Sequence, residues 1–358
     1  MSDDEGRFVL NVLVAPLQRN EAGRVVTYLL GTEFLKVTNH STVSQAVVKV
    51  VNDFEICYEN VTVFDTDNAA YMKKAFDQVL SGLFPNAIHV TCLAHIVNLV
   101  GESFRKPFTD FNSFVRSFSQ MFFMAGAQKG RYLSHLQMVM PDIYPGDKKP
   151  LNAPDPVQTR WNSWFYAVQY HNVHFPAYKG FIESEMSLCR NPPQSAVALH
   201  GALSDDQQFM ALQAEIRFVS EMCEAILHAL AQFESQKPCT LIAFDRLEEL
   251  LISCEANALS VDTMDKFHEN STQLSVDRRS QNTEIFRLAL EAAADKLHKY
   301  VSQSKDGQPA IEFLKAVRIL DPARVCVMSH HLKDYCVILG FFQCFARRVF
   351  SVCQHISP

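Results

Sequence analysis

The chain has 358 residues and a formal net charge of −6, with 48% apolar and 20% charged residues. This composition is typical of a folded globular protein and excludes a largely disordered chain. The sequence has no apolar run long enough to span a membrane, and its acidic start, MSDDEGRF, is unlike a signal peptide. The ten cysteines form no C-x-x-C pair, which favours reduced thiols in an intracellular protein.

Strand and helix patterns alternate in the first hundred residues. Phe8–Leu17 and Val25–Thr38 are strand-rich, and Asn20–Arg24 supplies the turn residues of a hairpin. Asn39-His40-Ser41 offers an N-cap for a helix over Val43–Phe54, which carries an apolar stripe at helical spacing. The short apolar runs Val61–Phe64 and Ala87–Val90 predict two further strands, each followed by a helical pattern.

Beyond Glu102 the patterns are almost entirely helical. Asp142–Gln158 is rich in proline and predicts an exposed loop. The later amphipathic helices are expected over Ala211–Gln236, Leu241–Cys254, Thr283–Ser302 and Ala310–Leu320. These stripes are typical of a helical bundle.

The segment Val61–Val100 holds the residues with the most chemical interest. Asp65 and Asp67 follow a buried strand at its carboxyl end, where α/β folds place ligand-binding groups. Asp67 fits two readings on chemistry alone, a metal-binding carboxylate or the N-cap of the following helix. Asp65 fits a supporting role at such a site, or a hydrogen-bonding or capping role. Cys92-x-x-His95 opens the next helix and offers half a zinc site, although the sequence contains no second pair of suitable spacing.

The order of four motifs resembles hAT-superfamily transposases, whose nuclease domain has a ribonuclease H-like fold. The motifs are TDNA at Thr66–Ala69, CLAH at Cys92–His95, TRWNSW at Thr159–Trp164 and Asp321-Pro322 within FLKAVRILDPARV. The resemblance implies an α/β fold, a ribonuclease H-like mixed sheet flanked by helices and followed by a large all-helical insertion region. The expected segments are a core over 1–140 with an incomplete first strand, a proline-rich loop over 141–159, the helical insertion over 160–325 and a divergent apolar tail over 326–358.

The resemblance places the second catalytic acid of the family on Asp67. Aligning Gly6-Arg7-Phe8-Val9 with the family pattern places the first acid before Met1, so Asp3 and Asp4 replace it only if the N-terminus folds back as a strand. The third acid of the family lies after the Asp-Pro landmark, but the sequence after Val325 contains no Glu and no Trp. Two of the three metal ligands are therefore expected to be missing, and a two-metal site needs several carboxylates.

The resemblance also places Cys92, His95, Arg160 and Trp161 near bound DNA. With the other parts of the site missing, Cys92 and His95 are expected to pack and hydrogen-bond locally, and Trp161 to anchor the insertion. We expect no metal site and no cofactor, unless the active alternative given below holds.

Two functional hypotheses follow. The first is a transposase-derived nuclear interaction module that is catalytically inactive, contacts nuclear proteins and binds DNA weakly at most, because a net charge of −6 opposes phosphate binding. The alternative is an active transposase or nuclease fragment that uses Asp67 with Mg²⁺ or Mn²⁺. No membrane partner is expected. The family's dimerisation element is missing, so we expect a monomer or an aggregation-prone chain with apolar surface around Val337–Phe350.

Overall fold

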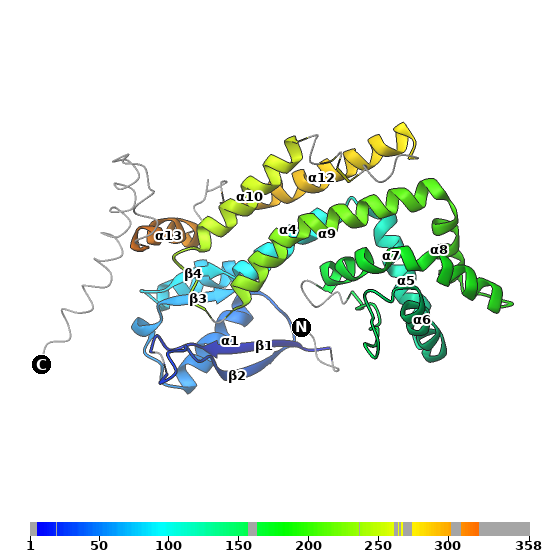
Figure 1. Ribbon diagram of the computed structural model, residues 1–358. Coiled ribbons are helices and arrows are strands. Elements are labelled where there is room, and N and C mark those ends of the chain that lie inside the picture. The colour runs from blue at the N-terminus through cyan, green and yellow to red at the C-terminus, as the bar shows by residue number, and fades with distance from the viewer. Residues whose placement is uncertain are drawn as a thin grey trace, which may run out of the picture. The chain divides into compact units, whose positions relative to one another are not determined.

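A computed structural model describes residues 6–18, 20–156, 163–235, 237–260, 264, 266–267, 274–301 and 309–321. The chain is mixed α/β and mostly helical, as expected (Figure 1). It divides into two compact units. The first comprises residues up to Ile96, Ala231–Glu248 and the chain from Lys299 onward, and the second comprises Val97–Leu230 and Glu249–His298. The region around Val337–Phe350 lies outside the described residues.

The first unit holds the strands, which form two separate pairs. Its elements are β1 (Phe8–Val14), β2 (Tyr28–Leu35), α1 (His40–Asp53), η1 (Tyr58–Asn60), β3 (Val63–Thr66), α2 (Ala70–Ala75), η2 (Phe76–Leu80), α3 (Ser81–Leu83), β4 (Ile88–Thr91), α13 (Pro309–Val317) and η3 (Arg318–Leu320). β1 pairs with β2 antiparallel, and β3 pairs with β4 parallel.

The one mixed sheet expected from the sequence is therefore not what the described residues form. No backbone ladder among them joins β1 or β2 to β3 or β4. Both pairs instead complete their burial on a shared apolar cluster around α1, since Leu10 and Val12 of β1 and Phe64 of β3 all pack against it. Helix packing thus takes the place of the strand pairing that would have merged the two sheets.

Local sequence signals explain the start of α1 and the hairpin turn. Asn39 caps α1 through a capping box, because its Oδ1 accepts from the N–H groups of Ser41 and Thr42 while Thr42 Oγ1 accepts from the Asn39 N–H. In the hairpin loop, Gly23 has a φ of 72°, and its N–H donates to the Asn20 carbonyl. Both predictions are confirmed.

The second unit is helical, and aromatic rings fill its core. Its helices are the larger part of α4 (Leu93–Arg105), α5 (Thr109–Phe122), α6 (Gly126–Val139), α7 (Ser163–Leu188), α8 (Gln194–Ser204), and most of α9 (Asp206–Glu234), α10 (Ala243–Leu259) and α12 (Val276–Val301). α5 buries Phe111, Phe114 and Phe118, whose three- and four-residue spacing places them on one face. Phe218 and Phe286 stack at 4.0 Å between centroids and so join α9 to α12. None of the described helices is both long and apolar enough to cross a bilayer.

Candidate functional site

The end of β3 positions the two acids that the sequence singled out. Phe64 pairs with His89 and Asp65 pairs with Val90 across the parallel ladder. Side chains alternate along a strand, so Phe64 and Asp65 lie on opposite faces. Phe64 stacks on Phe76 of η2 at 5.7 Å, which fixes the covered face and leaves Asp65 on the other one.

The three residues after Asp65 each make a structural hydrogen bond. Thr66 Oγ1 donates to the Asp67 carbonyl and lies 2.8 Å from His89 Nε2, so the imidazole Nε2–H is the donor of that second bond. Asp67 Oδ1 accepts from the Ala69 N–H at 3.1 Å. Asn68 Nδ2 donates to the Tyr300 hydroxyl at 2.7 Å. These hydrogen bonds therefore link the end of β3 to β4 and to the last turn of α12.

Of the two readings of Asp67, the N-cap of the following helix does not describe its position. The N-cap of α2 is Ala69, which has no capping side chain. Asp67 lies two residues before it and forms a local turn with the Ala69 N–H, the pattern that Asp side chains adopt readily outside helices. The helix start is thus stabilised by the turn that precedes it.

Asp65 carries the most perturbed carboxyl group of this site. Desolvation raises its pKa to about 6, and a hydrogen bond from the Thr66 N–H opposes that shift. The residue as a whole remains exposed, so solvent reaches this end of the strand. Protonation to the neutral acid and binding of a cation both compensate a desolvated carboxylate, and both are open to Asp65.

Cys92 occupies the cap position of α4. Its N–H donates to the Thr66 carbonyl at 2.8 Å, and its own carbonyl accepts from the Ile96 N–H at 3.1 Å, which is the first bond of the helix. Desolvation raises the pKa of the Cys92 thiol, and the nearby Asp65 and Asp67 raise it further, although the N–H groups of His95 and Ala94 oppose them. The thiol is consequently neutral at pH 7, unlike the thiolate that binds zinc.

His95 lies in the first turn of α4 and is half-buried. Among the described residues no group of three or more His, Cys, Asp or Glu side chains could hold a metal ion. Cys92 precedes the helix, and its sulfur lies beside the backbone N–H of His95.

Four of the residues named from the sequence lie outside the described part of the chain: Asp3, Asp4, Arg160 and Trp161. The nearby Trp164 is described, and its buried indole packs edge-on against Phe111 of α5 at 5.6 Å. The second tryptophan of the TRWNSW motif therefore anchors α7 within the helical unit.

Three residues near the strand end were not predicted from the sequence: His89, Tyr71 and Tyr300. The sequence pattern indicated a role for His89 only weakly, because a polar residue that alternates with apolar ones is ordinary in the strand beside β3. Desolvation lowers its pKa, so the ring is neutral at pH 7. Tyr71 lies close enough to Asp67 for that carboxylate to raise its pKa, after desolvation as the larger cause. Tyr300 had no signal, because 232 positions separate it from Asn68.

The comparisons with known proteins leave the family open. No family model matches the chain, and no curated protein matches it.

Proposed function

We propose that this chain is a transposase-derived, ribonuclease H-like protein that acts as a non-enzymatic nuclear interaction module and contacts DNA weakly at most. The proposal rests first on the motif order from Thr66 to Asp321. A net charge of −6 supports it, because strong DNA binding relies on phosphate neutralisation by Lys and Arg.

The non-enzymatic part of the proposal rests on the hydrogen bonds that side chains at the end of β3 already make. Asp67 is engaged with the Ala69 N–H, and Asn68 is engaged with the Tyr300 hydroxyl. A two-metal nuclease needs carboxylates that several elements direct onto the same pair of ions. Here the side chains at this position stabilise a turn and a contact between distant segments. No cofactor forms part of the proposal.

A cleavage assay tests the inactive state. Purified protein is incubated with duplex and hairpin DNA in Mg²⁺ and in Mn²⁺, alongside the variants Asp67→Asn and Asp65→Asn. Asp53→Asn, an exposed acid at the end of α1, is the matched control. We expect every protein to remain at background. Nicking by the wild type and by Asp53→Asn, but not by Asp67→Asn, would overturn the proposal.

The alternative is an active Mg²⁺- or Mn²⁺-dependent transposase or nuclease fragment, and one observation favours it. Asp65 is exposed while its pKa is raised to about 6, and a divalent cation would compensate that desolvated charge. Titration of the Asp65 carboxyl by NMR with and without Mg²⁺ distinguishes the two. The proposal expects the same pKa in both conditions, whereas a large fall in millimolar Mg²⁺ would support the alternative.

A pull-down from nuclear extract tests the interaction module. The extract is split, and one half is treated with nuclease before capture. We expect protein partners to survive nuclease treatment. Recovery that depends entirely on intact DNA would contradict a protein-binding role.

A further inference from the structure

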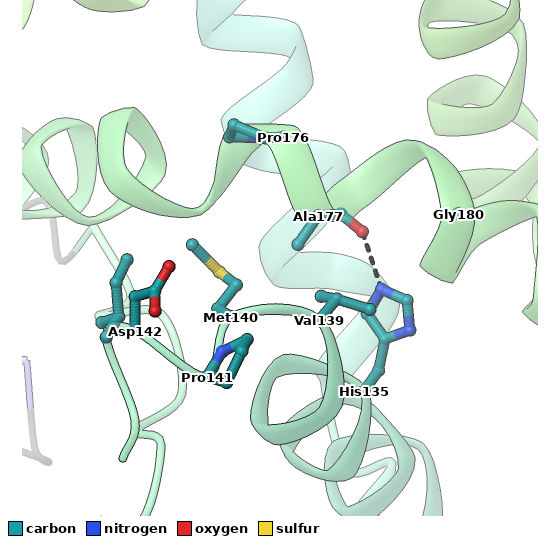
Figure 2. A pocket seen from close by; sticks show the side chains of 9 residues that line it. His135, Val139, Met140, Pro141, Asp142, Pro176, Ala177 and Gly180 are labelled. Atoms are coloured by element: carbon teal, nitrogen blue, oxygen red, sulfur yellow. Dashed lines mark hydrogen bonds between the residues drawn. The ribbon is translucent and has the colours of Figure 1, made fainter.

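A shallow cavity of about 340 Å³, open to solvent, lies between the C-terminal end of α6 and the middle of α7 in the helical unit (Figure 2). Pro176 lies inside α7 and contributes to the cavity wall. Because proline has no N–H, the Asn172 carbonyl lacks its usual partner four residues on, and the ring displaces the preceding turn. α7 nevertheless continues through Pro176 as one helix, so the proline removes a single backbone hydrogen bond beside the cavity.

The cavity is lined by polar and apolar atoms in nearly equal measure, although most of its side chains are apolar. Val139, Met140, Pro141 and Ile143 line it from the end of α6 and the following turn, and Pro176 and Ala177 line it from α7. Its volume falls within the range of small-molecule sites, which are largely apolar with a few placed polar groups. The chemistry of those few polar groups therefore decides what it can bind.

His135 lines the cavity, and one of its ring nitrogens already makes a hydrogen bond within the protein. Its Nε2 lies 2.9 Å from the Ala177 carbonyl, and since a carbonyl only accepts, the imidazole Nε2–H is the donor. Gly180 faces the ring, where a Cβ would lie 3.8 Å from His135 Cε1. Figure 2 shows this bond closing one side of the cavity.

Asp142 is the polar side chain that remains for a ligand. Figure 2 shows its carboxylate beside the Met140 side chain at the wall of the cavity. Within the described part of the chain, no hydrogen bond or ion pair joins this carboxylate to another group. Lys148, on the same loop, holds its ammonium over the Tyr144 ring at 5.7 Å. The cavity thus combines several apolar side chains with one anionic group that makes no ion pair among the described residues.

We propose that this cavity binds a small organic amine in its protonated form. The ammonium group donates to the Asp142 carboxylate, and the apolar body packs against Met140 and Pro176. An ionised carboxylate only accepts hydrogen bonds, so the site selects a donor and repels an anion. This site is independent of the strand end discussed above.

The test uses a pair of probes with the same shape and opposite charge. 2-Phenylethylamine and 3-phenylpropionate are titrated into the full chain at pH 7, with heats measured by calorimetry and the Met140 methyl followed by NMR. The resonance is assigned with Met140→Leu. We expect saturable one-to-one binding of the amine with a shift of the Met140 methyl, and no binding of the acid.

Two variants make the result specific. Asp142→Asn should weaken amine binding at least tenfold, and Asp147→Asn, an exposed acid on the same loop that does not line the cavity, should leave it unchanged. Both positions are exposed, so neither change should unfold the protein, and circular dichroism verifies this. Equal binding of the two probes, an undisturbed Met140 methyl, no saturable amine binding, or an Asp142→Asn affinity within twofold of wild type would overturn the proposal.

Discussion

The Asn68 amide donates to the Tyr300 hydroxyl over 2.7 Å, and this bond joins the end of β3 to the last turn of α12. Tyr300 is buried, and desolvation raises the pKa of its hydroxyl. The contact holds a chain segment from the C-terminal part of the sequence against the strand end that carries Asp65 and Asp67. The candidate site therefore depends on residues more than two hundred positions away.

Removing this acceptor should cost stability. Tyr300→Phe leaves the Asn68 amide without its partner, and we expect the free energy of unfolding to fall by about 1 kcal/mol in urea titrations. Tyr166→Phe, at an exposed tyrosine of α7, is the matched control and should change nothing. In the double variant with Asn68→Ala the losses should not add. Additive losses would show that the two side chains do not interact.

Two glycines inside helices should respond to alanine in opposite directions. A Cβ at Gly101 in α4 would lie 2.8 Å from Phe165 Cε2 and 3.0 Å from Cζ, and this ring is buried. Gly101→Ala should therefore lower the free energy of unfolding by about 1–3 kcal/mol. A Cβ at Gly130 in α6 meets nothing within 4 Å. Gly130→Ala should raise the free energy by about 0.5–1 kcal/mol, since alanine favours the helix. Thermal denaturation of the two variants measures both changes, and a stable Gly101→Ala protein would show that Phe165 moves aside.

Acid should destabilise the helical unit through His171. Its ring is buried, with Nδ1 2.8 Å from the Tyr178 hydroxyl, and desolvation followed by the neighbouring His174 lowers its pKa from 6.5 to about 3. The folded state thus favours the neutral ring. The stability that this provides is complete above pH 6.5 and is lost as the pH falls toward 3, by about 1.4 kcal/mol per pH unit.

Urea titrations at pH 7.5, 6 and 5 measure the His171 effect as the difference between wild type and His171→Phe. The difference should shrink at lower pH, because the variant takes up no proton at this position. His228→Gln, at an exposed histidine of α9, should track the wild type throughout. A constant difference between wild type and His171→Phe would mean that His171 does not titrate on unfolding.

Glu215 should change the free energy of unfolding over a different pH range from His171 and in the opposite direction. Its carboxyl is buried in α9, and desolvation, with Asp110 as a second cause, raises its pKa to about 8 against the opposing effects of Arg278 and the Phe111 N–H. The folded state binds the proton more tightly than the unfolded state. The resulting stability is complete below about pH 4.5 and is lost as the pH rises to 8.

Glu215→Gln should remove that loss. The variant should be about as stable as the wild type at pH 4.5 and more stable at pH 8.5, because the amide stays neutral while an oxygen can still accept from the Phe111 N–H. Glu224→Gln, at an exposed position of the same helix, is the control. Chemical denaturation at both pH values provides the comparison. A variant that loses stability at pH 8.5 would show that Glu215 is needed as an anion.

The helices could be predicted from the sequence, because the features that specify a helix lie within a few residues of one another. The stripe over Ala211–Gln236 anticipates α9 at Asp206–Glu234, and Asn39 marks the start of α1, since apolar spacing and capping depend on residues within a few positions. The family resemblance placed Cys92 near the site that carries Asp67, and in the structure Asp65 and Asp67 lie close enough to the Cys92 thiol to raise its pKa.

Only the tertiary structure decided how those elements combine. The separation of the strands into two pairs, the contact of Asn68 with Tyr300 and the burial of Glu215 depend on which surfaces pack together across long stretches of chain. The role of Asp67 depends on the same packing, because whether a carboxylate binds a metal or closes a turn depends on the groups that the fold brings to it. Spacing along a sequence reports the local conformation, whereas the charge and solvation of a site come from neighbours that spacing does not encode.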